Sequence, residues 1–279
     1  MTGVVAFGIV ILLLPVLVVA AVLAAAWREG RSSPYAFSVG RVISNSFAAI
    51  GGAPLVFVGV ALLLNGLPSL MVGMTTAQIT RSPELVAASM SQVGTTYGGI
   101  FLLRLLVWPF TQGLLMLLAV EALAGRVPDL RRAAGTALRV WIFAIGLTLL
   151  NWIGITIGFF LFILPGLVLF LNWFVALPVL FVERRGVFEA FGRSTELLRG
   201  MRWRLLLLLV IALVLWFFAA MVGGVLQATL PDSWMTHAAT LVGATVGGML
   251  VPAGIAAVYH EAVTAKEGAG GRDLSDVFA

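Results

Sequence analysis

The chain has 279 residues, of which 61% are hydrophobic and only 10% are charged. With a mean hydropathy of +1.09, it lies far outside the range of soluble proteins and predicts a polytopic membrane protein. The net charge of +5 does not indicate a nucleic-acid partner, because the basic residues lie in short segments between apolar runs. The absence of cysteine excludes disulfides, thiolate metal sites and cysteine nucleophiles.

Seven apolar runs are long enough to cross a bilayer as helices, since about 20 residues at 1.5 Å per residue match its hydrocarbon core. They cover residues 4–26, 46–72, 96–122, 136–160, 164–182, 203–229 and 236–260. The fold class is therefore all-α. We expect an N-terminal anchor and linker over 1–33, a six-helix bundle over 34–262, and a tail over 263–279.

The basic residues indicate the orientation. Threading seven crossings places all 17 of them except Arg81 and Arg104 in the first, third and fifth connections or in the tail. This face is predicted to be cytoplasmic, with the N-terminus outside and the C-terminus inside. A cleaved signal peptide over 1–26 is the alternative, because Ala24-Ala25-Ala26 would tolerate cleavage, although Met1-Thr2-Gly3 carries no basic residue.

Three segments on the basic face predict short amphipathic helices in the membrane interface. The first starts at Ser33-Pro34 and has an apolar stripe of Phe37, Val42, Ile43 and Phe47. The second runs from Pro128 to Arg139, with Leu130, Ala134 and Leu138. The third runs from Gly186 to Gly200, with Val187, Phe191, Thr195 and Leu198 on one face and an i, i+4 pair of Glu189 and Arg193 opposite.

Each amphipathic segment precedes two spans, which predicts helix-plus-hairpin units over 34–122, 128–182 and 186–262. Plain alternation of loops and hairpins explains the same pattern. The three helices would form an interfacial basic collar that attracts anionic phospholipids, although orientation alone also explains these arginines. The collar residues are Arg131, Arg132, Arg184, Arg185, Arg193 and Arg199.

Arg104 is the one basic residue inside a span, where insertion of an arginine costs roughly 2.5–3.5 kcal/mol at the helix centre. It is close enough to the outer end, about 12 Å, to reach a lipid phosphate by snorkelling. A lipid-binding role and a structural role both remain open.

Asn151-Trp152 and Asn172-Trp173 flank a predicted hairpin apex near Leu161 to Pro165, with Pro165 and Gly166 at the turn. Both asparagines then lie at one depth and would hydrogen-bond across the hairpin. Alternatively, together with Arg104 and Gln112, they would line a polar pocket for a lipid headgroup or a solute.

Other polar residues favour structural roles. His260 and Glu261, beside Tyr259, are expected to cap the last span at the membrane interface. His237 is expected in a solvent-exposed loop on the opposite side. Glu121 and Glu183 end spans near Arg126 and Arg184, where charge pairing explains them. The sequence shows no metal-ligand motif, phosphate loop or nucleophile elbow, so we expect no metal, no cofactor and no enzymatic activity.

The pattern around the fifth span resembles a family. It consists of Leu164-Pro165-Gly166, Ala176-Leu177-Pro178, Glu183, Glu189-Ala190, Arg193-Ser194 and Leu197-Leu198-Arg199-Gly200. The ends agree, at Phe37-Ser38-Val39-Gly40, Ser46-Phe47, Ala265-Lys266-Glu267-Gly268 and Val277-Phe278. Over about residues 35–279 the chain resembles the membrane domain of glycerophosphoryl diester phosphodiesterases and of stand-alone bacterial integral membrane proteins.

The resemblance implies a six-helix bundle with an accessory role in the cytoplasmic membrane of a bacterium. The chain departs from it by the additional span 4–26 and by lacking the catalytic phosphodiesterase domain, so that activity is not expected. We therefore expect a scaffold or accessory factor in envelope or lipid homeostasis. The alternative is a small transporter or lipid-translocating protein with a polar pocket near Arg104. Membrane lipids are the expected partners, and the sequence leaves protein partners and oligomeric state open.

Overall fold

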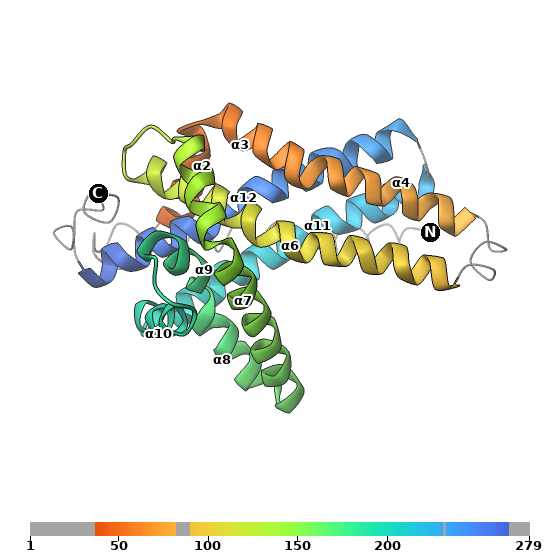
Figure 1. Cartoon of the computed structure of the whole chain (residues 1–279). Helices are drawn as coiled ribbons and strands as arrows, with labels where there is room; N and C mark the ends of the chain where they lie inside the picture. The colour runs from red at the N-terminus through yellow and green to blue at the C-terminus, as the bar shows by residue number, and fades with distance from the viewer. Residues whose placement is uncertain (1–36, 82–89, 231–232, 268–279) are drawn as a thin grey trace, which may run out of the picture.

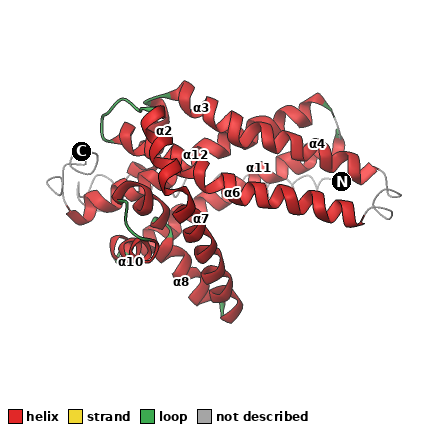
Figure 2. Ribbon diagram, viewed as in Figure 1, coloured by secondary structure: helices red, strands yellow, loops and turns green. Residues whose placement is uncertain are grey.

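The computed structural model describes residues 37–81, 90–230 and 233–267. These residues are almost entirely helical and include no strand (Figure 2). Six helical stretches in them are long and apolar enough to cross a membrane. They are Pro54–Met74, Leu102–Leu123, Leu130–Leu161, Ile163–Glu183, Arg202–Thr229 and Trp234–Glu267. The six predicted core spans and the all-α class are confirmed, whereas the predicted span 4–26 lies outside the described residues.

Two shorter helices, α2 (Val39–Gly51) and α10 (Val187–Leu198), lie at one end of the bundle (Figure 1). The last turns of α12 (Trp234–Glu267) and the connections 124–129, 184–186 and 199–201 lie at the same end. We call this the charged end, because most of the ion pairs described below are found there.

Helix α2 begins at Ser38, whose extended backbone and side-chain acceptor for the Arg41 N–H form an N-cap. The start predicted at Ser33-Pro34 lies outside the described residues. Phe37 and Val42 of the predicted stripe are buried and Ile43 is half-buried, but Phe47 is exposed. Val39, Ser46 and Ala49 supply the rest of the buried face.

The second predicted amphipathic helix does not exist as a separate element. Asp129 accepts hydrogen bonds from the N–H groups of Arg131 and Arg132 and caps α7, which runs unbroken over Leu130–Leu161. The face was also wrong: Ala133 and Ala137 are buried, while Leu130 and Leu138 are exposed. Small side chains allow close helix contact, and the leucines are left for the surface that lipid would cover.

Helices α7 and α8 (Ile163–Trp173) form a tight hairpin that reverses at Phe162, which has an extended backbone. A Cβ on Gly158 would lie 2.9 Å from Gly166 Cα, so both glycines are required for close packing. Gly166 therefore lies within α8 rather than in the turn, and Pro165 belongs to the first turn of α8.

Prolines account for the irregular backbone in two spans. Helix α3 (Pro54–Ala61) continues through a π-helical turn, η1 (Leu62–Gly66), into α4 (Leu67–Arg81), and Pro68 lacks the N–H that would extend the α-helical ladder. The span Ile163–Glu183 breaks after Trp173 into α9 (Ala176–Pro178) and a second π-helical turn, η2 (Val179–Glu183).

Helix α6 (Met90–Leu123) is the central span. In its most apolar stretch 61% of the residues are buried, compared with 11% in that of α11 (Arg202–Thr229). It passes through Pro109 without a break. The Trp141 indole N–H of α7 donates to the carbonyl of Leu106 at 2.7 Å. Gly113 faces the Phe181 ring, which a Cβ would approach to 2.1 Å, and this contact fixes η2 against α6.

Candidate functional site

The charged end contains two groups of ion pairs that join distant parts of the chain. In the first, Glu261 of α12 is buried, and one of its carboxylate oxygens accepts two hydrogen bonds and takes part in an ion pair. The donors are the Ser38 N–H at 3.1 Å and Arg41 Nε at 2.8 Å, and Arg41 Nη2 forms the ion pair at 2.6 Å. Arg204 of α11 adds a bond of 2.7 Å to the Phe37 carbonyl. The start of α2 is thus fastened to both α11 and α12.

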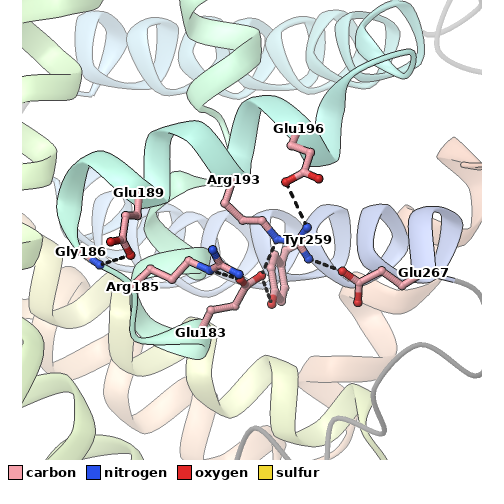
Figure 3. Close-up of polar contacts among 8 residues, drawn as sticks. All are labelled: Glu183, Arg185, Gly186, Glu189, Arg193, Glu196, Tyr259 and Glu267. Atoms are coloured by element: carbon pink, nitrogen blue, oxygen red, sulfur yellow. Dashed lines mark hydrogen bonds and ion pairs between the residues drawn. The ribbon is translucent and has the colours of Figure 1, made fainter.

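The second group is centred on Glu183, the last residue of η2 (Figure 3). Its Oε1 accepts from the Tyr259 hydroxyl at 3.2 Å and from Arg193 Nε at 3.3 Å, and its Oε2 accepts from Arg185 Nε at 2.7 Å. Arg193 also bonds Glu267 of α12, and Glu196 at 3.4 Å. One arginine of α10 therefore joins three carboxylates from η2, α10 and α12.

The electrostatics of Arg193 reflect this position. Burial disfavours its charge, but the hydrogen bond to Glu267 and the charge of Glu183 outweigh burial and raise the pKa of the guanidinium above its ordinary value. The predicted pairing of Arg193 with Glu189 is wrong. Glu189 instead accepts the Gly186 N–H at 3.4 Å at the start of α10, where a carboxylate is favoured by the helix dipole.

The segment from Gly186 to Gly200 contains the short helix α10, Val187–Leu198. Phe191 and Leu198 of its predicted face are buried, and Ala190, Ser194 and Leu197 complete that face. Phe191 packs against Trp173 with ring centroids 4.5 Å apart. The Ser194 hydroxyl donates to the Asn172 carbonyl at 2.6 Å, just before the break in the fourth described span.

The predicted basic collar divides into residues with different surroundings. Arg185 and Arg193 are held by carboxylates. Arg131 and Arg132 are exposed in the first turn of α7, and Arg184 is exposed with a left-handed backbone, φ 52°. Arg199 ends α10 and is exposed. Glu121 is buried and accepts the Asp129 N–H at 3.0 Å, which joins the end of α6 to the start of α7.

Arg104 and Gln112 are not brought together as a pocket. Arg104 lies on the exposed face of α6 and donates to the Ser69 hydroxyl of α4 at 3.2 Å. Gln112 is 3% exposed, and its Oε1 has no hydrogen-bond partner in the described part of the chain.

The predicted hydrogen bond between Asn151 and Asn172 is not formed. Their side-chain oxygens are each buried and unpartnered within the described residues, as is the hydroxyl of Thr148, one turn from Asn151. Gly158 contacts Gly166, and a Cβ on Gly154 would lie 2.4 Å from the Trp173 ring. This antiparallel register places both asparagines at one depth, as predicted, but with unsatisfied amides.

The two histidines lie on different parts of the bundle. His237 is near the start of α12, and His260 is near its other end, with a buried Nδ1 that lacks a partner among the described residues. Within residues 37–81, 90–230 and 233–267, no group of three His, Cys, Asp or Glu side chains could hold a metal ion.

The chain matches no protein-family model, no curated protein and no solved structure. Its function must therefore be inferred from the charged end and from the unsatisfied amides.

The ion pairs of Arg41, Glu261 and Glu267 at the charged end were not predicted from the sequence, which suggested only an interfacial cap for Glu261. Their signal is weak, because partners such as Arg41 and Glu261 are 220 residues apart. The only hint is that an acidic residue near the end of an apolar run, such as Glu261, needs a positive partner when it is buried.

Proposed function

We propose that this protein is a non-enzymatic, multi-pass protein of the bacterial cytoplasmic membrane, with its charged end in the cytoplasm. In this proposal it acts as a scaffold or accessory factor in envelope or lipid homeostasis. The observation that carries the proposal is the use of ionised side chains at the charged end. Glu183, Arg193 and Glu267 bond one another, as do Arg41 and Glu261, and they fix α2 and α10 to the bundle.

The fixed helices α2 and α10 form a rigid surface at the charged end, which we call the platform. Such a surface suits protein binding rather than catalysis. A catalytic acid or base must reach a substrate, but the carboxylates of Glu183 and Glu261 are largely occupied by neighbouring arginines. The resemblance to the membrane domain of glycerophosphoryl diester phosphodiesterases is part of the same proposal. So are the N-terminal span 4–26 and the placement of α2 and α10 in the cytoplasmic interface, which their basic surroundings support.

The orientation can be tested directly because the chain contains no cysteine. Val127→Cys introduces a thiol in an exposed connection at the charged end, and Leu230→Cys introduces one at the opposite end. Thr2→Cys tests the N-terminal span. A membrane-impermeant maleimide applied to whole cells should label the cysteines at positions 2 and 230 but not the one at 127. Labelling of position 127 would show that the charged end faces outward.

The scaffold role predicts a protein contact at the platform. Phe188 of α10 is 79% exposed at the charged end, and Phe160 is 92% exposed at the tip of the α7–α8 hairpin. A photo-crosslinking amino acid at 188 should capture one defined protein in cells, while the same residue at 160 should capture lipid. Lipid alone at both positions would count against a scaffold.

The unsatisfied amides favour a second candidate function, a transporter or lipid-translocating protein. Asn151, Asn172 and Thr148 leave buried oxygens free beside a broken helix, and broken helices line substrate sites in many transporters. Proteoliposomes with a fluorescent phospholipid separate the two functions. Accelerated transbilayer movement that Asn151→Leu abolishes would support transport, and rates equal to protein-free vesicles would support the scaffold.

A further inference from the structure

The turn between α10 and α11 carries charge that the protein does not neutralise. Arg199 ends α10, Gly200 reverses the chain with φ 88°, and Arg202 starts α11. The Met201 N–H returns to the Leu198 carbonyl at 3.0 Å, so the turn is short and well defined. The two arginines are therefore held three positions apart on either side of one tight reversal.

The start of α11 adds positive charge from the backbone. Met201 provides no side-chain cap, and the helical ladder begins with the Leu205 N–H bonding the Met201 carbonyl at 3.0 Å. The preceding N–H groups in the first turn have no intrahelical acceptor. A helix start normally favours acidic residues, yet this one has arginine at its first position and no acidic residue in its first turn.

The arginines of this turn differ from Arg193, which has three carboxylate partners. No ion pair joins Arg199 or Arg202 to an acidic residue within the described residues, and Arg202 Nε is buried without a hydrogen-bond partner there. Buried donors of this kind are nearly always satisfied in folded proteins. Arg202 as a residue is partly exposed, and its unpaired Nε is an observation separate from the helix start.

Trp203 gives the position of the turn relative to the membrane. Its side chain is 82% exposed next to Arg202, at the point where the most apolar of the six spans begins. Exposed tryptophans at the ends of membrane helices lie at the level of the lipid headgroups. A phosphate at that level lies within reach of arginine side chains and of free backbone N–H groups.

We propose that the turn Arg199–Trp203 binds the phosphate of an anionic phospholipid. Guanidinium groups of Arg199 and Arg202 pair with the phosphate oxygens, and the first N–H groups of α11 complete the site. The inference deepens the proposed function, on whose membrane setting it rests. It replaces a diffuse collar by one defined headgroup site.

The test uses the full chain in nanodiscs of phosphatidylcholine containing a minor fraction of phosphatidylglycerol, followed by native mass spectrometry. The wild-type chain should retain phosphatidylglycerol preferentially. The double variant Arg199→Gln/Arg202→Gln should bind it roughly 10- to 100-fold more weakly, since each charged hydrogen bond contributes strongly to such a contact. Arg202→Lys should be intermediate, because it keeps the charge and loses the planar fork.

The control is Arg131→Gln/Arg184→Gln, which removes the same amount of charge from two exposed arginines elsewhere at the charged end. It should retain the lipid like the wild-type chain. Equal loss in both double variants would mean diffuse attraction and would overturn the site, as would full retention in the first. Displacement of the lipid by excess inorganic phosphate would identify a site for free phosphate instead.

Thermal unfolding of each variant in detergent checks that the fold is kept. If Arg199→Gln/Arg202→Gln proves unstable, Arg202→Lys alone provides the decisive comparison. The readout is lipid retention by the purified chain, so it is separate from cysteine labelling and crosslinking in cells. The proposal of a headgroup site can therefore be disproved while the proposed scaffold function is kept, and the scaffold function can be disproved while the site is kept.

Discussion

The charged end and the apolar arms of this protein are stabilised in different ways. We call the outer parts of α7, α8 and α11 the apolar arms, and most of their large side chains are exposed. The α7–α8 hairpin diverges from α6, α11 and α12 as it leaves the charged end (Figure 1). At the charged end, by contrast, side chains from α2, η2, α10 and α12 bond one another. Specific contacts hold the first region, and the surrounding lipid must cover the second.

The contrast predicts where substitutions matter. At the charged end Glu183, Arg193 and Glu261 have defined partners, so the loss of one of them takes a partner away from another group. On the arms, exchange of one apolar residue for another should have little effect. The following changes test this difference, from the largest expected effect to the smallest.

Glu261→Ala should cause the largest loss, about 3 kcal/mol of unfolding free energy, because it removes the buried carboxylate that accepts from the Ser38 N–H and pairs with Arg41. The midpoint of thermal unfolding in a single detergent measures it. Combining it with Arg41→Ala should cost less than the sum of the two single changes, since both remove the same contact. An unaltered midpoint would show that the pair contributes nothing.

Gly113→Ala should cost roughly 1–3 kcal/mol, because the new methyl group would meet the Phe181 ring. Gly146→Ala in α7 is the matched control, since a Cβ there meets nothing within 4 Å. The control should be neutral or slightly stabilising, as alanine favours helix. If both variants unfold at the same midpoint, the close contact of η2 with α6 is not a stabilising feature.

Arg193→Gln should release α10, with a local cost of about 2 kcal/mol from the lost charged hydrogen bonds. Hydrogen exchange of residues 187–198 should rise, while exchange in the middle of α6 stays slow. Arg193→Lys should restore only part of the protection. Faster exchange throughout the bundle would instead indicate global unfolding.

Asn151→Leu should change the unfolding free energy by less than about 1 kcal/mol, because its side-chain oxygen gives up no hydrogen bond. A clear loss of stability in thermal unfolding would instead support the predicted hydrogen bond between Asn151 and Asn172.

Glu196→Gln should have the smallest effect, within about 0.5 kcal/mol. Glu196 is 71% exposed and only one of the three carboxylates around Arg193, and exposed ion pairs contribute little. A loss as large as that of Glu261→Ala would erase the distinction between buried and exposed pairs.

The spans could be predicted from the sequence because hydropathy and length are local properties, and each of the six core runs overlaps a described span, although the first run, 46–72, began eight residues too early, within α2. The faces of the helices were harder. In the first half of α7 the buried positions are the alanines Ala133, Ala137 and Ala144, and hydropathy ranks alanine below the leucines beside them. In a membrane the most apolar side chains face lipid, so a pattern that works for soluble helices selects the wrong face.

The site could be predicted only in part, because its contacts join residues that are far apart in the sequence. Arg193 was recognised as a polar residue of α10, but its main partners, Glu183 and Glu267, depend on how η2 and α12 pack beside it. Likewise the register of the α7–α8 hairpin brings Asn151 and Asn172 to one depth, whereas the orientation of their amides depends on side-chain packing.

The tip of the α7–α8 hairpin has a consequence for how the chain enters the bilayer. From Ile157 to Leu171 the sequence has no charged or hydrogen-bonding side chain, and two backbone hydrogen bonds close the reversal at Phe162. The Phe162 N–H bonds the Gly158 carbonyl, and the Gly166 N–H bonds the Phe162 carbonyl. The tip of the hairpin therefore carries no polar side chain, so the side chains that must cross the hydrocarbon core with it are all apolar.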